Sequence, residues 1–227
     1  MPRERRPGQQ PAVKPVRRPE LRLPPLRPCG DAELTPDGDY DGLLFDGTDL
    51  SYGEAAGARF LDCSLEGCAL DGTVLRNARV IDSRLTGVRG VGTDLAGAAL
   101  RDVELLDARL GGTQLHGAAL ERVVIRGGKI DYLNLRRARL RDVVFEDVVL
   151  AEPDFGGASL ERVSFDGCTV AGADLTGARL TDVDLRGITR LDLARGAGSL
   201  AGAVISTTQL LELAPVLAAE LGVRVQD

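Results

Sequence analysis

The sequence lacks tryptophan and has few aromatic residues of any kind, at 4% of its 227 positions. A core built from large rings is therefore excluded, and small and aliphatic side chains must fill the interior. No apolar run approaches the roughly 18 residues of a membrane-spanning helix. The basic start is not followed by an apolar leader segment, so we expect a cytoplasmic protein with no membrane anchor.

Histidine is also scarce, occurring once as His116, and the four cysteines form no CxxC pair. A catalytic pair or triad that uses histidine would depend on His116 alone, and the scattered cysteines do not indicate a zinc or redox site. A glycine-rich phosphate loop is missing as well. We expect a protein that is not an enzyme, with no metal, no cofactor and no small-molecule substrate.

Proline and positive charge are concentrated in residues 1–30, which carry eight of the eleven prolines and a net charge of +6. Such a segment has too little apolar surface to offset its ordering entropy, so we expect a disordered basic tail. Its LPPLRP stretch, Leu23 to Pro28, would suit a polyproline II ligand. The acidic residues 31–54 that follow offer a surface on which the tail could fold back.

From Phe60 to Leu185 the sequence repeats every five residues without an insertion. The central position is Phe, Leu, Ile or Val in 25 of 26 pentads, and only Gly90 departs. The central residue and the one two before it never carry a charge, which marks both positions as buried. An inward, an outward and an inward residue form a short strand, and two residues rich in Gly and Asp then turn the chain.

Four such sides close a square coil of twenty residues, and successive coils can stack at roughly 4.8 Å, the spacing of hydrogen-bonded strands. The sequence thus predicts an all-β solenoid over residues 31–205. Runs such as ADLTGARLTDVDLRG (173–187) resemble the A(D/N)LXX signature of pentapeptide repeat proteins, over about residues 41–190. This resemblance implies a right-handed quadrilateral β-helix.

The C-terminal segment, residues 206–227, changes to a helical pattern. Ser206 and Gln209 have the spacing of a capping box, and Pro215 is expected to kink the helix or split it into two. We expect the segment to cap the open end of the solenoid. Resemblance to the MfpA-type members of the family implies that it also forms a homodimer. The leucines of one helical face would serve as cap or dimer contacts: Leu210, Leu213, Leu217 and Leu221.

Residues twenty apart share one face of such a solenoid, so the outward charges can be sorted by face. The face centred on the column from Leu65 to Leu185 carries a net charge of −4, because its carboxylates outnumber Arg84, Arg126 and Arg186. We call it the acidic face and predict that it binds a protein partner. Its carboxylates are Glu66, Glu104, Asp107, Glu146, Asp147, Asp166 and Asp184.

Three functions are consistent with these features. The first is a non-catalytic protein-interaction scaffold whose partner is unidentified. The second, implied by resemblance to the quinolone-resistance members of the family, is a DNA-mimicking modulator of DNA gyrase. A rod of about seven coils would be about 35 Å long, or about ten base pairs, although the interspersed arginines argue against a DNA-like surface. The third is nucleic-acid binding by the basic tail.

Overall fold

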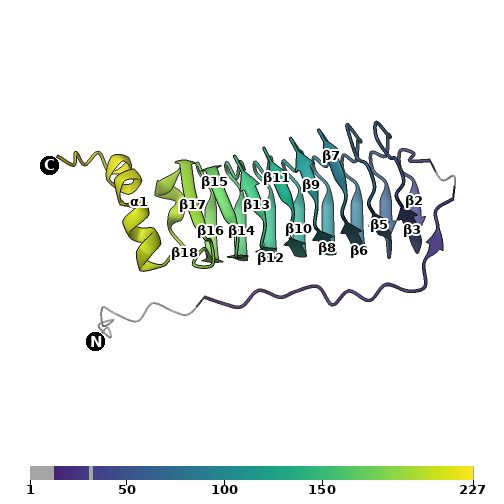
Figure 1. The fold of residues 1–227 in the computed structure, drawn as a ribbon, viewed down its shortest axis with the longest axis horizontal. Coiled ribbons are helices and arrows are strands. Elements are labelled where there is room, and N and C mark those ends of the chain that lie inside the picture. The colour runs from purple at the N-terminus through teal and green to yellow at the C-terminus, as the bar shows by residue number, and fades with distance from the viewer. Residues whose placement is uncertain (1–12, 31–32, 227) are drawn as a thin grey trace, which may run out of the picture.

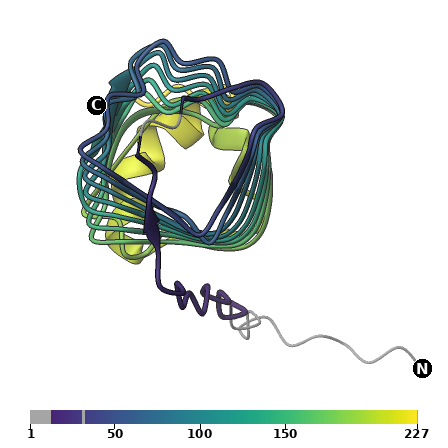
Figure 2. The same ribbon diagram turned by 90° about the vertical axis from the view of Figure 1, so that its right-hand side faces the viewer.

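The computed structural model describes residues 13–30 and 33–226. These residues form one rod of stacked coils, with an extended N-terminal segment along its side and one helix at its C-terminal end (Figure 1). The rod is a right-handed quadrilateral β-helix of about nine turns, and the view along its axis shows the four sides (Figure 2). The predicted fold class is confirmed, with more turns than the seven expected.

The chain forms short strands, one 3-10 helix and one α-helix. They are β1 (Arg27–Pro28), β2 (Asp39–Asp41), β3 (Leu43–Asp46), β4 (Arg59–Leu61), β5 (Ser64–Glu66), β6 (Arg79–Thr86), β7 (Arg89–Val91), β8 (Ala99–Leu106), β9 (Arg109–Gly111), β10 (Ala119–Arg126), β11 (Lys129–Asp131), β12 (Arg139–Glu146), β13 (Val149–Ala151), β14 (Ser159–Asp166), β15 (Thr169–Asp174), β16 (Arg179–Asp184), β17 (Arg190–Arg195), η1 (Ala197–Leu200), β18 (Ala203–Val204) and α1 (Thr207–Glu220). The strands pair in parallel within two sheets, and the partner of most residues lies twenty positions away.

The corners of the coils explain the glycines and aspartates of the repeat. Every fifth residue from Asp37 to Asp182 has a positive φ, between 47° and 76°. For a residue with a Cβ this left-handed conformation costs roughly 1–2 kcal/mol of free energy, whereas for glycine it carries no such cost. Half of these corners are glycine. Several others, such as Asp107 and Asp147, lie against a glycine corner of the next coil, which leaves room for their side chains.

The central column forms a continuous apolar core, in which the rings of Phe145 and Phe165 stack with centroids 4.6 Å apart. Gly90 interrupts this column. A cavity of about 60 Å³ lies in the interior beside it. Four of the leucines that line the cavity are only partly buried: Leu85, Leu95, Leu100 and Leu105.

The count of five breaks at the C-terminal end of the rod. Val170 pairs with Leu191, one residue beyond the expected partner, and the offset of twenty returns where Val183 pairs with Ala203. Helix α1 then covers this end of the core (Figure 1). The Ser206–Gln209 capping box is confirmed, and the Gln209 amide Nε2 also donates to the Leu185 carbonyl at 2.7 Å.

Pro215 does not split the C-terminal helix, contrary to the sequence-based expectation. Helix α1 runs unbroken from Thr207 to Glu220 with Pro215 inside it. Proline removes one backbone hydrogen bond from a helix interior. On both sides of Pro215, however, side chains pack against the end of the solenoid core, with Leu213 buried and Leu217 partly buried. This packing stabilises the helix across the proline.

The N-terminal segment differs from the disordered tail expected for residues 1–30. Residues 13–30, which we call the strap, are extended and run along the outside of the rod toward its C-terminal coils (Figure 1). Strand β1 within the strap pairs with β3, so Arg27 and Pro28 belong to the first coil. The expected disorder of residues 1–12 falls outside the described residues.

Candidate functional site

The carboxylates of the acidic face lie on one ladder of strands, as the spacing of twenty predicts. Arg84 pairs in register with Glu104, and Arg126 pairs with Glu146, which pairs with Asp166. The acidic face is formed by residues on, or directly after, seven stacked strands: β5, β6, β8, β10, β12, β14 and β16. The ladder therefore brings residues from seven coils onto one side of the rod.

Arginines of the same face neutralise three of its seven carboxylates. Arg84 donates to Glu104 at 2.7 Å, Arg126 donates to Glu146 at 2.6 Å, and a third pair joins Arg186 to Asp184 at 2.7 Å. The other four have no ion pair within residues 13–30 and 33–226: Glu66, Asp107, Asp147 and Asp166. The face is thus less negative than its count of carboxylates suggests.

Two of the paired carboxyl groups, Glu146 and Asp184, have a pKa below the ordinary value. Burial by itself raises the pKa of Glu146. The hydrogen bonds from Arg18 and Arg126 lower this pKa by more than burial raises it, so the net shift is downward. The guanidinium of Arg186 likewise lowers the pKa of Asp184. Groups held in the charged form are suited to binding cations rather than to transferring protons.

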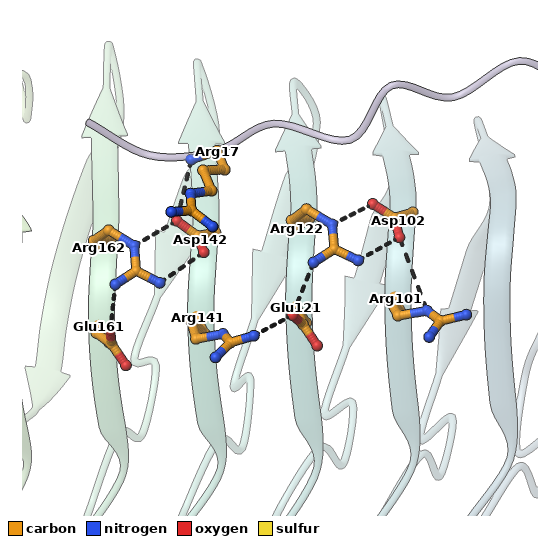
Figure 3. A network of polar contacts seen from close by, with 9 residues as sticks. All are labelled: Arg17, Arg101, Asp102, Glu121, Arg122, Arg141, Asp142, Glu161 and Arg162. Atoms are coloured by element: carbon orange, nitrogen blue, oxygen red, sulfur yellow. Dashed lines mark hydrogen bonds and ion pairs between the residues drawn. The ribbon is translucent and has the colours of Figure 1, made fainter. Parts of the chain in front are cut away.

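The strap binds to this side of the rod through three basic residues. Lys14 Nζ lies 3.3 Å from the carboxylate of Asp182, and the guanidinium of Arg18 forms an ion pair with Glu146. The backbone N–H of Arg17 donates to the carboxylate of Asp142 at 3.1 Å (Figure 3). Sequence reasoning expected a disordered tail or one folded back on the acidic residues 31–54, whereas these three residues contact carboxylates of later coils.

Three apolar residues at the N-terminal end of the strap face the rod at intervals of three, and the spacing then changes, because the next partly buried residues are Leu21, Leu23, Leu26 and Cys29. Val13, Val16 and Pro19 are partly buried, while the residues between them are exposed. These three side chains therefore lie on the side of the extended strap that faces the rod. Val13 and Val16 line a groove of about 230 Å³ together with Val144 and Ser164 of the solenoid.

A network of ion pairs follows the corner beside the strap (Figure 3). Arg122 binds both carboxylate oxygens of Asp102, and Arg162 binds both carboxylate oxygens of Asp142. In each pair the aspartate belongs to the coil that precedes the coil of the arginine. Arg141 pairs with Glu121 of the preceding coil. The sequence carries the signal for this network, because charges alternate in sign at intervals of twenty: Arg101, Glu121, Arg141 and Glu161, and Asp102, Arg122, Asp142 and Arg162.

The leucines predicted for the cap or dimer contacts divide into two pairs. Leu213 and Leu217 face the solenoid, with Leu213 2% exposed. Leu210 and Leu221 face outward and are 48% and 79% exposed. The first pair thus packs against the end of the solenoid core, while the second pair lies outside that core.

Two further observations concern other classes of site. Among the residues that the structure describes, no three His, Cys, Asp or Glu side chains are grouped so that they could hold a metal ion. No helix in the same part of the chain has the length and apolar character needed to cross a membrane. His116 lies exposed on the outside of the rod.

Comparison with known proteins gives the family of the chain. A model of the pentapeptide repeat region matches residues 58–135, and a model of eight pentapeptide repeats matches residues 133–167 and 158–188. Together these matches span more than half of the chain. A search of curated proteins finds no match.

Two solved structures of pentapeptide repeat proteins are similar to the chain. One is HetL, involved in heterocyst differentiation regulation in the cyanobacterium Nostoc sp. strain PCC 7120; it shares 18% identity over 78% of this chain and 93% of its own, with a TM-score of 0.40. The other is QnrB1, a plasmid-mediated fluoroquinolone resistance protein, with 17% identity over 84% of this chain and 95% of its own, and a TM-score of 0.40. By its repeat and by the family models that match it, the chain belongs to the pentapeptide repeat family.

Proposed function

We propose that the protein is a non-catalytic scaffold whose acidic face binds a basic part of another protein. One observation carries this proposal: the same side of the rod already holds a basic segment, because Arg18 of the strap pairs with Glu146. A surface that binds one cationic segment has the charge needed to bind another.

The stacking of the coils makes this face a rigid array of charges. Each coil is hydrogen-bonded to the coils above and below it, so outward side chains recur at the roughly 4.8 Å spacing of strands. Asp147 and Asp166 have no cation partner within the described chain and lie beside the paired Glu146. A cationic partner could therefore reach these two carboxyl groups without moving the backbone of the rod.

The partner would be identified by affinity capture with the immobilised full chain and confirmed by titrating the purified partner. We expect Glu146→Lys with Asp147→Lys to weaken binding by at least tenfold, since two attractive charges become repulsive. Glu54→Lys, which changes an exposed charge on a different side, serves as the matched control and should bind normally. Capture of no selective partner, or equal binding by all three proteins, would contradict the proposal.

The gyrase-directed alternative has one observation in its favour, which is the length of the rod. Nine turns at roughly 4.8 Å give about 40 Å, comparable with about twelve base pairs of DNA. The pairing of three acidic-face carboxylates with arginines counts against a DNA-like surface. DNA-mimicking modulation of DNA gyrase predicts saturable effects on supercoiling or on quinolone-stabilised cleavage. No effect at micromolar protein would exclude it.

The outer surface of helix α1 suits contact with a second copy of the chain. Leu210, Leu211 and Leu221 are 48%, 71% and 79% exposed, and grouped exposed apolar side chains favour association. We expect a homodimer that dissociates in Leu211→Lys with Leu221→Lys, measured as mass by analytical ultracentrifugation. A monomeric wild-type chain at micromolar concentration would contradict this.

We place the protein in the cytoplasm because Cys63, Cys68 and Cys168 are buried free thiols.

A further inference from the structure

We infer that the groove beneath the strap is a binding site for extended basic peptides with an apolar residue at every third position, and that the strap is its built-in competitor. This inference rests on the proposed scaffold function and gives the partner's chemistry and the regulation of the site. Four features of the strap and the groove support it.

The length and conformation of the strap match the rod. From Lys14 to Arg27 an extended chain at roughly 3.1 Å per residue covers about 40 Å. The rod surface it covers, from the strand partner of Arg27 to Asp182, spans seven coils, or about 34 Å. The backbone N–H groups of Lys14 and Arg17 donate to the carboxylates of Asp182 and Asp142 and not to a strand of the rod, so side chains of the groove determine what it accepts.

The charges of groove and strap are complementary. Lys14 contacts Asp182 and Arg18 contacts Glu146, two coils apart. Between these pairs, the Arg17 N–H binds Asp142, whose carboxylate is fixed by Arg162. The site therefore offers carboxylates at fixed positions in two columns of the solenoid, Asp142 and Asp182 in one and Glu146 in the other, which selects a peptide with basic residues several positions apart.

The solenoid surface under the strap carries apolar side chains that its own fold does not require. Val124 and Val144 occupy outward positions of β10 and β12, where the repeat usually carries polar or charged residues. They are nevertheless only 4% and 1% exposed. Val144 shares the groove with Val13 and Val16, so the valines of the strap supply the apolar contact every third residue.

The strap is held firmly at one end only. Near Cys29 it is joined to the first coil by backbone hydrogen bonds from Arg27 and Cys29. At the other end, the side chains of Lys14 and Arg18 are 70% and 50% exposed, and ion pairs of this kind stabilise little. The attachment nevertheless keeps the strap at a local concentration on the order of millimolar. An incoming peptide must therefore bind better than the strap to displace it.

The probe is a fluorescent peptide with the strap sequence, residues 13–26, titrated by anisotropy. It is tested on the full chain, on a strap-release variant (Lys14→Glu, Val16→Asp and Arg18→Glu), and on that variant with Glu146→Lys added. Glu54→Lys in the strap-release variant is the matched control. A peptide with Val16→Asp and Arg18→Glu tests sequence selectivity. Circular dichroism and thermal unfolding verify that each protein is folded.

We expect the strap-release variant to bind the peptide about tenfold more tightly than the wild type, because the competitor has been removed. Glu146→Lys should abolish that gain, Glu54→Lys should keep it, and the altered peptide should not bind. Equal affinity of wild type and strap-release variant, or a gain that survives Glu146→Lys, would overturn the inference. The assay needs no natural partner, so failure to capture one would contradict the proposed function without changing this result.

Discussion

Arg162 lies one coil after Asp142 and binds both oxygens of its carboxylate. Its Nε donates to Oδ1 at 2.7 Å and its Nη2 donates to Oδ2 at 2.8 Å, while Asp142 is only 2% exposed. A bidentate pair of this kind satisfies a buried charge that would otherwise be costly. Asp142 also binds the strap, so this pair links the stability of the rod to the candidate site.

Replacing Arg162 should destabilise the rod strongly. Arg162→Met leaves the buried Asp142 carboxylate without its main partner, and we expect a loss of about 3–5 kcal/mol in the free energy of unfolding. Arg101→Met is the control, because Arg101 is exposed and lies 3.9 Å from Asp102. Urea titrations of both variants measure the difference. Similar unfolding midpoints for the two would contradict the role assigned to Arg162.

The same pair predicts an acid-dependent loss of stability. The hydrogen bond from Arg162 is the largest cause that holds the pKa of Asp142 below its usual value. A carboxyl whose pKa is depressed by folding adds stability above its unfolded pKa, about 3.9, and that stability is lost as the pH falls through the folded pKa. The unfolding free energy should therefore fall less between about pH 5 and pH 2 in Asp142→Asn than in the wild type. Parallel curves for the two proteins would contradict this.

Asp82 should behave in the opposite sense. Burial raises its pKa, and the neighbouring Asp102 and Asp62 raise it further. The folded chain therefore favours the protonated form, and the charged form opposes folding at neutral pH. Asp82→Asn should raise the melting temperature at pH 7, with a benefit that shrinks as the pH falls and Asp82 becomes protonated. Asparagine tolerates the left-handed φ of 47° at this corner. A lower melting temperature at pH 7 would refute the assignment.

Two threonines in one column should respond differently to loss of their hydroxyl groups. Thr93 Oγ1 donates to the Leu70 carbonyl at 2.8 Å, whereas the buried Thr113 Oγ1 has no hydrogen-bond partner among residues 13–30 and 33–226. We expect Thr93→Val to cost about 1 kcal/mol, and Thr113→Val to be neutral or stabilising, because it removes an unsatisfied polar atom. Thermal unfolding of both variants checks this. An equal loss in both would contradict it.

The register of the repeat can be tested with adjacent residues. Leu135 is 1% exposed in the core, whereas Arg136 lies on the surface and pairs with Asp154 at 2.9 Å. Leu135→Asp should abolish folding, because it places an uncompensated carboxylate in an apolar column. Arg136→Gln should cost less than about 1 kcal/mol, since exposed ion pairs contribute little. Circular dichroism and thermal unfolding distinguish the two outcomes.

The strap and the C-terminal helix show where prediction from sequence failed. Composition indicated disorder for the strap because no local pattern offered it a partner. Its contacts with Asp142 and Asp182 lie more than a hundred residues away in sequence. Likewise, Pro215 was expected to break the helix, but packing of Leu213 and Leu217 against the solenoid outweighs the lost hydrogen bond.

The sequence by itself determined the solenoid, its inward columns and the grouping of the acidic face. All three follow from a strict period of five, which recurs locally and needs no long-range information. Only the tertiary structure decided which carboxylates are paired and what lies over them. Arg126 and Arg18 reach Glu146 from a neighbouring coil and from the opposite end of the chain, and such contacts depend on distances in space that the order of residues does not contain.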